Sequence, residues 1–214
     1  MTGAAGISRA ATSHTAADTF IETERLRLVP WAPAHLLALI DSVPHFERLS
    51  GMTIASGLRD HLVSDEVSPA WLAMLRASTQ TDPWRHGYAV VHRGSNAIIG
   101  SAAFKGPPGD DGVVEIAYGV APDHQGRGYA TEAAEALVAF ASRVDGIHVI
   151  RAHTAPTPNA STRVLTKCGF QQVGEIVDPE DGPVWRWERD PANVQRRDSN
   201  AVTGAIREPR CFES

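Results

Sequence analysis

Alternating apolar and charged positions mark the strands that we expect along the chain. Residues 24–31 alternate through Arg25-Leu26-Arg27-Leu28-Val29 and predict a half-buried opening strand. Residues 88–93 and 97–105 flank the turn Gly94-Ser95-Asn96 and predict a β-hairpin. A segment rich in Gly and Pro then leads to a third strand at 113–120. The middle of the chain is therefore expected to hold three consecutive antiparallel strands.

Other segments repeat their apolar positions at the helical period. A helix is predicted after Pro33 and another after Pro69, since apolar residues follow each proline at helical spacing. Between residues 130 and 141 an apolar stripe predicts a longer helix, with Glu132, Glu135 and Arg143 facing solvent. A strand at 148–154 follows it, and such a crossover predicts parallel pairing with the strand at 113–120.

The last elements complete the fold class. Asn159 is predicted to cap a helix that carries Cys168 on its inner face and ends at Gly169. Strands at 170–175 and 184–189 follow. The whole pattern predicts a mixed α/β (α+β) fold: a central mixed, mostly antiparallel sheet of about six to seven strands with helices on both faces.

The same pattern sets the expected domain limits. The length of 214 residues fits one domain with tails, since a domain typically has about 150 residues. Residues 1–19 hold no apolar block and are predicted to form a disordered N-terminal arm, with an organellar transit peptide as the alternative interpretation. Residues 20–190 form the expected domain, and residues 191–214 form a polar C-terminal tail.

Composition and charge exclude several classes of function. The chain has 20 Lys and Arg against 25 Asp and Glu, and no basic run, so nucleic acid is not an expected partner. No apolar run approaches the length of a membrane span, so we expect no membrane insertion. Cys168 and Cys211 are too few and too far apart for a disulfide framework or a zinc knuckle. A reducing compartment, the bacterial cytoplasm, fits best.

The loop after the third strand carries the candidate chemistry. Two glycines, Gly126 and Gly128, lie where the next helix begins, and Arg127 lies between them. First-turn amides are unpaired and the helix dipole is positive there, so this loop can surround a pyrophosphate. A tight turn without a ligand is the alternative. The chain has no Gly-Lys-Ser/Thr for a Walker loop, and no carboxylate ends the strand at 148–154 to hold a dinucleotide ribose.

Four separated segments resemble one family in the right order. Gln125-x-x-Gly128-x-Ala130 resembles the acyl-CoA loop of the GCN5-related N-acetyltransferase (GNAT) superfamily. The flanking segments 24–28, 115–120 and 163–170 are similar to strands and a helix of its ribosomal-protein-alanine (RimJ/RimL-like) branch. The resemblance covers roughly residues 20–190. It implies the GNAT acyl-CoA N-acyltransferase fold, with acetyl-CoA as co-substrate and no metal.

The resemblance also implies the residues that bind acetyl-CoA. Backbone amides of the loop would hold the pyrophosphate: Gln125, Gly126, Arg127, Gly128, Tyr129 and Ala130. A splayed strand around Tyr118, Gly119 and Val120 would pair with the pantetheine arm and place an N–H at the thioester oxygen. The branch usually has asparagine where Pro158 stands, so Asn159 is shifted by one; it stays a candidate CoA contact, although capping alone explains it.

Two residues are candidates for the proton transfers of an acyl transfer from acetyl-CoA to an amine. Glu115 lies on the strand within a few residues of the expected thioester position, where it can act as a base, most simply through water. A solvated or salt-bridged glutamate is the alternative. Ser161 is the candidate acid for the departing thiolate by resemblance, with an ordinary first-turn serine as the alternative.

The acceptor is less defined by the sequence. Residues 44–86 occupy the region that sets acceptor specificity, where Trp71, Trp84 and His86 form either an aromatic wall or part of the core. His86, His124 and His153 show no metal-ligand spacing. Three hypotheses follow: acetylation of a protein or peptide α-amine, acetylation of a small-molecule amine, and a catalytically silent acyl-CoA-binding module. The oligomeric state stays open, with a homodimer as one option.

Overall fold

One mixed sheet organises the protein, whose structure is a computed structural model that describes residues 20–63, 68–179 and 181–192. Within these ranges eight strands follow the order β1-β2-β3-β4-β5-β6-β8-β7. The strands are β1 (Ile21–Glu22), β2 (Leu26–Pro30), β3 (Tyr88–His92), β4 (Ala97–Phe104), β5 (Val113–Val120), β6 (Val149–Thr154), β7 (Gln171–Asp178) and β8 (Gly182–Arg189). The predicted N-terminal arm, and nearly all of the predicted tail, lie outside the described residues.

The strand pairing confirms the predicted mixed, mostly antiparallel sheet. All neighbouring strands pair antiparallel except β5 and β6, which pair parallel as the crossover predicted. The sheet has eight strands, whereas the sequence pattern gave six to seven. The additional strand is the two-residue β1, which folds back onto β2 with Ile21 opposite Leu28.

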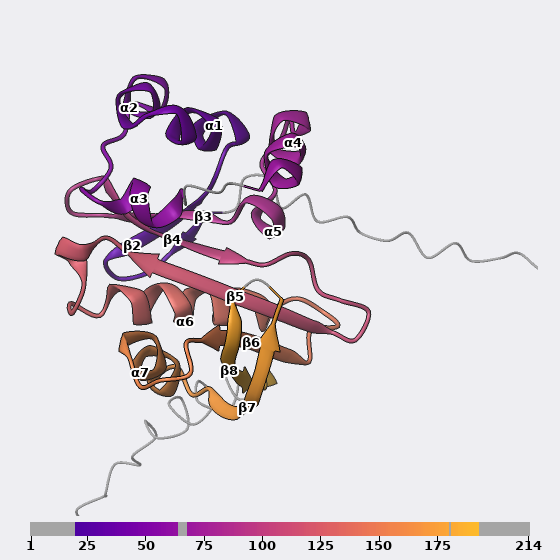
Figure 1. The fold of residues 1–214 in the computed structure, drawn as a ribbon. Coiled ribbons are helices and arrows are strands. Elements are labelled where there is room, and N and C mark those ends of the chain that lie inside the picture. The colour runs from indigo at the N-terminus through magenta and orange to yellow at the C-terminus, as the bar shows by residue number, and fades with distance from the viewer. Residues whose placement is uncertain (1–19, 64–67, 180, 193–214) are drawn as a thin grey trace, which may run out of the picture.

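Helices cover both faces of the sheet, as predicted (Figure 1). The helices are α1 (Pro33–Asp41), α2 (Val43–Ser50), α3 (Leu58–Leu62), α4 (Pro69–Ala77), α5 (Pro83–His86), the 3₁₀ helix η2 (Pro122–His124), α6 (Tyr129–Ala141) and α7 (Ala160–Lys167). Four of the α-helices begin with a proline in their first turn, where its missing N–H costs no hydrogen bond. None of the helices in the described ranges combines the length and the apolar character that crossing a membrane requires.

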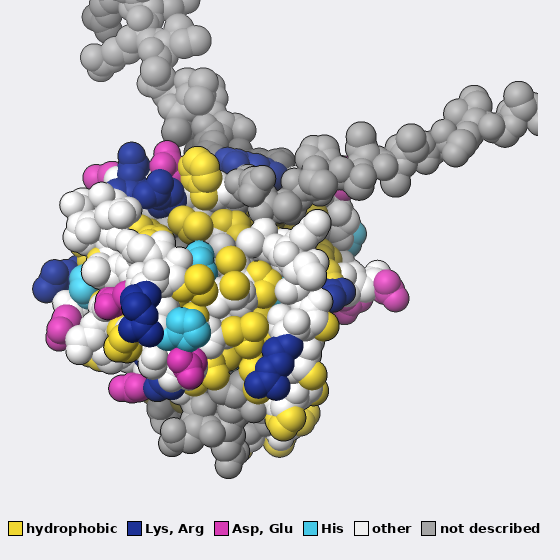
Figure 2. Space-filling view, turned by 90° about the horizontal axis from the view of Figure 1, so that it is seen from above, with side chains coloured by type: hydrophobic (Ala, Val, Ile, Leu, Met, Phe, Trp, Pro, Cys, Tyr) yellow, Lys and Arg dark blue, Asp and Glu magenta, His cyan; other side chains and the backbone are white. Residues whose placement is uncertain are grey.

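The described residues form two hydrophobic cores, one on each face of the sheet. On one face Leu39, Phe46 and Leu58 from α1, α2 and α3 pack against β3 and β4. On the other face residues of α6 and α7, among them Leu137 and Leu165, pack against the same sheet. Figure 2 looks from above Figure 1, onto the side of α1, α2 and α4, where hydrophobic side chains lie between scattered charged ones.

One prediction for α6 was wrong. Glu132 was expected to face solvent, but its side chain is only 15% exposed and is held by Thr23 and Arg25. The helical period places Glu132 off the apolar stripe, as expected, but the residues before β2 cover this side of the first turn of the helix. The apolar pattern within α6 cannot show that Arg25, about one hundred residues earlier in the chain, packs against Glu132.

The cap of α7 agrees with the sequence. The Asn159 side chain accepts a hydrogen bond from the Thr162 N–H at 3.0 Å, and the Thr162 hydroxyl accepts one from the Asn159 N–H at 3.0 Å. The two residues form a capping box, which satisfies two otherwise unpaired amides. Gly169 follows the helix with φ of +77°, the left-handed conformation that glycine adopts without strain.

Candidate active site

The sheet opens along the second half of β5. Pairing with β6 ends after three residue pairs, the last being Glu115 with Arg151, whereas pairing with β4 continues to Val120. Alternate residues of a strand direct their backbone groups to opposite neighbours. The Glu115 carbonyl accepts the Lys105 N–H from the β4 side. Residues of the opposite parity, such as Tyr118 and Val120, therefore direct their backbone groups into the opening.

One cavity lies between this open edge, the loop before α6, and α7. It has a volume of about 280 Å³, and we call it the loop cavity. Eight of the predicted acetyl-CoA contacts line it: Tyr118, Gly119, Val120, Gln125, Gly126, Gly128, Tyr129 and Ala130. Arg127 and Asn159 are not among its lining residues, and the Asn159 side-chain oxygen is engaged in the cap of α7.

The backbone of the loop has the features that bind anions. Gly126 and Gly128 have φ of +73° and +84°, and Gly128 is the N-cap of α6. The amides of residues 126–131 donate no hydrogen bond to any residue that the structure describes. The Gln125 amide group anchors the loop by donating to the Val120 carbonyl at 3.1 Å. Several unpaired N–H groups at the positive end of a 13-residue helix suit a pyrophosphate.

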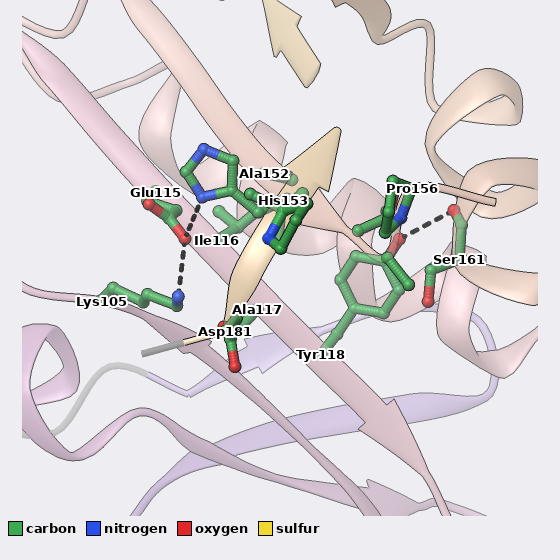
Figure 3. Close-up of a pocket in the computed structure, with 14 residues that line it drawn as sticks. Lys105, Glu115, Ile116, Ala117, Tyr118, Ala152, His153, Pro156, Ser161 and Asp181 are labelled. Atoms are coloured by element: carbon green, nitrogen blue, oxygen red, sulfur yellow. Dashed lines mark hydrogen bonds and ion pairs between the residues drawn. The ribbon is translucent and has the colours of Figure 1, made fainter. Parts of the chain in front are cut away.

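A second cavity of about 480 Å³ lies on the other side of Tyr118 (Figure 3). We call it the Glu115 cavity. Polar side chains from five elements or their ends line it, and apolar residues of β5, β6 and β8 complete its wall; the polar ones are Lys105, Glu115, Tyr118, His153, Thr154, Ser161 and Asp181. Tyr118 and Ser161 line both cavities. The two predicted catalytic residues, Glu115 and Ser161, therefore share one cavity.

Glu115 is held by two cationic or polar partners. Its Oε1 lies 2.9 Å from the Lys105 Nζ and 3.1 Å from the His153 Nδ1 (Figure 3). No residue in the described part of the chain bonds Oε2. The pKa of Lys105 is raised: burial, the largest influence, lowers it, but the hydrogen bond and negative charge of Glu115, with Asp181 and Asp178, outweigh burial. Glu115 is thus salt-bridged and keeps one free oxygen.

Tyr118 and Ser161 meet where the two cavities join. The Tyr118 hydroxyl donates to the Ser161 carbonyl at 3.4 Å, which links β5 to α7 across the opening (Figure 3). Burial raises the pKa of the Tyr118 phenol, so it stays protonated. The Ser161 hydroxyl makes no hydrogen bond to the described residues and lines both cavities. Its place at the junction suits transfer of a proton between them.

Sequence reasoning did not single out Lys105. The sequence alone would not place it, because a connection of residues 106–112 puts residue 105 opposite Val113, whereas in the structure the Lys105 N–H donates to the Glu115 carbonyl. The three histidines separate: His153 contacts Glu115, His124 lines the loop cavity, and His86 bonds Ser78 and Asp82 away from both. No cluster of possible metal ligands forms among the described residues.

The proposed aromatic wall does not form at the Glu115 cavity. Trp84 packs against Phe104 and Phe140, with ring centroids 4.5 and 5.6 Å away, and is part of the core on the α6 face. Trp71 and His86 do not line the Glu115 cavity either. The core interpretation is therefore correct for Trp84. His86 is buried away from both cavities, and burial lowers its pKa.

Comparison with known proteins agrees with this geometry. The profile of the acetyltransferase (GNAT) domain matches residues 25–171. The chain is 26% identical over 93 residues to an uncharacterized N-acetyltransferase, p20, of Bacillus licheniformis; the match covers 44% of this chain and 52% of that protein. The chain thus spans about half the length of the curated relatives that it matches.

Solved structures share the fold. The ribosomal-protein-S5-alanine acetyltransferase from Vibrio fischeri superposes with a TM-score of 0.57 at 15% identity, over 81% of this chain and 97% of that one. RimL, a ribosomal L7/L12 alpha-N-protein acetyltransferase in complex with coenzyme A, has a TM-score of 0.57 at 17% identity, over 80% and 98% of the two chains. The family profile covers more than half of the sequence, and the chain belongs to the GNAT acetyltransferase family.

Proposed function

We propose that this chain transfers the acetyl group of acetyl-CoA to a primary amine by direct attack within a ternary complex. One observation carries the proposal: two cavities meet along the open edge of β5, one lined by unpaired amides and the other by a carboxylate with a free oxygen. Acetyl-CoA supplies an already activated acyl group, so the protein's tasks are alignment and proton transfer.

The loop cavity suits the cofactor. The amides of residues 126–131 bind the pyrophosphate, and the backbone groups of Tyr118 and the N–H of Val120 pair with the pantetheine arm, since the Val120 carbonyl already accepts from Gln125. A backbone N–H at this edge stabilises the negative charge that develops on the thioester oxygen during attack. Arg127 is not among the residues that line the cavity, so beyond its backbone N–H it contributes only long-range charge.

The Glu115 cavity suits the acceptor amine. Glu115 accepts the amine proton through a bridging water at its free Oε2, while Lys105 and His153 fix the carboxylate from the Oε1 side. The neutral amine attacks through its lone pair, and the C–N bond forms as the C–S bond breaks; the proton that Glu115 accepts is the one that leaves the nitrogen in this step, and Glu115 returns it to solvent. Ser161 at the junction donates its hydroxyl proton to the departing thiolate and regains one from solvent. Each proton has a donor and an acceptor in this scheme.

The first experiment measures the melting temperature of the protein with and without saturating acetyl-CoA. NADH and ATP serve as controls, because both carry phosphates on adenosine but no pantetheine arm. A ligand at about 100 times its Kd adds about 2.7 kcal/mol to the free energy of unfolding, a shift of several degrees. A shift with acetyl-CoA alone supports the cofactor assignment, whereas no shift with acetyl-CoA refutes it.

An acceptor screen by CoA release follows. N-terminal peptides represent the protein α-amine, the acceptor class that the name of RimL, a ribosomal L7/L12 alpha-N-protein acetyltransferase of similar fold, gives. Amino acids, polyamines and aminoglycosides represent small-molecule amines. Turnover with either set supports acetyl transfer and names the acceptor class. Tight acetyl-CoA binding without turnover by any amine would instead indicate the catalytically silent acyl-CoA-binding module.

A further inference from the structure

Arg25 and Glu132 join the start of β2 to the first turn of α6. Both the Arg25 Nε and its Nη2 lie 2.7 Å from the Glu132 Oε2. The Arg25 backbone N–H donates to the Glu132 Oε1 at 2.8 Å, and the Thr23 hydroxyl donates to the same oxygen at 2.6 Å. Glu132 therefore accepts hydrogen bonds at both oxygens, in a geometry that fixes the Arg25 side chain.

The fixed Arg25 guanidinium contacts the backbone of the loop that precedes α6. The Arg25 Nη1 donates to the Arg127 carbonyl at 2.9 Å. Its Cζ lies 4.6 Å above the centre of the Tyr129 ring, a cation–π distance. A Cβ placed on Gly128 would lie 3.3 Å from the Arg25 Nη2. One side chain thus contacts Arg127 and Tyr129, and it would crowd any Cβ on the Gly128 between them.

The bond to the Arg127 carbonyl has a consequence for the next amide. In a planar trans peptide the C=O and the following N–H point in opposite directions. Arg25 holds the Arg127 carbonyl on its own side, so the Gly128 N–H is turned away from Arg25. Gly128 lines the loop cavity, and its N–H is one of the amides without a partner among the described residues.

Charge gives Arg25 a second effect. Glu132 is an acidic residue in the first turn of α6, close to the amides that suit an anion. An unpaired carboxylate there would repel a pyrophosphate, and Arg25 neutralises it at 2.7 Å. We propose that Arg25 is a positioning residue for the cofactor: it orients the Arg127–Gly128 peptide and cancels the charge of Glu132 at the pyrophosphate loop. The inference rests on the proposed acetyl-CoA site.

Calorimetric titration of acetyl-CoA tests this role without any turnover. Arg25→Met removes both the charge and the carbonyl contact, and we expect acetyl-CoA affinity to fall by about 10- to 100-fold, the effect of a lost charge-assisted hydrogen bond. Arg25→Lys keeps the charge and loses the forked geometry, so its affinity should lie between. Arg25→Met with Glu132→Gln should recover part of the loss, since the unpaired carboxylate is gone.

Arg59→Met is the matched control. The Arg59 guanidinium also donates two hydrogen bonds to main-chain carbonyls, those of Leu39 and Ile40, at 2.9 and 2.7 Å. It ties α3 to α1 and does not line the loop cavity. We expect this variant to lose stability while its acetyl-CoA affinity stays within about twofold of the unmodified protein. A purely structural role for Arg25 would make the two methionine variants alike.

The outcomes separate the inference from the proposed function. If the unmodified protein binds acetyl-CoA, and Arg25→Lys and Arg25→Met bind it with the same affinity as the unmodified protein, the inference is overturned and the proposed function still stands. If the unmodified protein binds no acetyl-CoA, both are overturned. Should Arg25→Met fail to fold, Arg25→Lys decides: at saturating acetyl-CoA its kcat and acceptor KM should stay unchanged while its KM for acetyl-CoA rises.

Discussion

Replacing Gly100 by alanine tests how closely β4 and β5 must pack beside the opening. Gly100 lies opposite Val120, at the end of the pairing between the two strands. A Cβ on Gly100 would lie 2.4 Å from the carbonyl oxygen of Gly119 and 3.3 Å from the Cα of Val120. Both are backbone atoms, so no side-chain rotation can relieve the clash.

The size of the effect follows from this distance. Real Cβ atoms essentially never approach a neighbour within 3.0 Å, so the two strands must separate by about 0.6 Å or more. Overpacking of this kind costs about 1–3 kcal/mol. For a domain of this size that corresponds to a melting temperature lower by roughly 3–10 °C. The displaced segment lines the loop cavity, so acetyl-CoA binding should weaken as well.

Gly174→Ala provides the matched control. Gly174 also lies in a strand, β7, but a Cβ there would meet nothing within 4 Å. Alanine at an unstrained glycine position stabilises by about 0.4–1 kcal/mol through the unfolded state. Thermal unfolding and acetyl-CoA titration of both variants check the reasoning. If Gly100→Ala is as stable as Gly174→Ala, the close approach of β4 and β5 is not required, and the steric argument is refuted.

Three further predictions concern titratable groups. Glu115→Gln should lower kcat by about 10²- to 10⁴-fold while calorimetric acetyl-CoA affinity holds; unchanged kinetics would return Glu115 to a purely structural salt bridge. The pKa of Glu132 is lowered, because its hydrogen bonds with Thr23 and Arg25 and the charge of Arg25 outweigh burial, which raises it. The ionised Glu132 carboxylate therefore stabilises the fold fully above its unfolded pKa of about 4.3, and this stabilisation is lost as the pH falls through the lowered folded pKa. Urea unfolding should accordingly show that the difference in unfolding free energy between the unmodified protein and Glu132→Gln vanishes in acid. A difference that stays constant with pH would contradict this. Cys168 is 1% exposed and burial raises its pKa to about 12, so iodoacetamide should label it only in denaturant, as peptide mass spectrometry would show; labelling of the native protein at pH 8 would contradict this.

Local patterns predicted the elements that carry the site. The strand at 113–120 was placed at its observed bounds, because β5 is flanked by a Gly- and Pro-rich connection and by Pro122. The helix after Gly128 and the cap at Asn159 were placed correctly because both depend on residues within one turn. Such signals lie in a few neighbouring positions and survive without knowledge of the tertiary structure.

Long-range packing decided what the sequence did not predict. The two-residue β1 has no pattern of its own, and its pairing with β2 defines it. Glu132 looks like a solvent-facing helix residue until Arg25 is brought onto it. The division of the opening into two cavities depends on the Tyr118 side chain contacting α7, a contact between residues 43 positions apart. These features arise from the packing of distant segments.

The short pairing of β5 with β6 affects how the domain comes apart. The strands on one side of the β5–β6 pairing, β1 to β5, come from residues 21–120. The strands on the other side, β6 to β8, come from residues 149–189. Three residue pairs join the two halves of the sheet. Each half is contiguous in sequence, and strand pairing joins them over a short stretch only; the hydrophobic core that they share, with Val114 on one side and Ile150 on the other, also holds them together. A ligand that contacts both halves of the sheet would couple them, so the free energy needed to separate the halves would depend on the cofactor concentration.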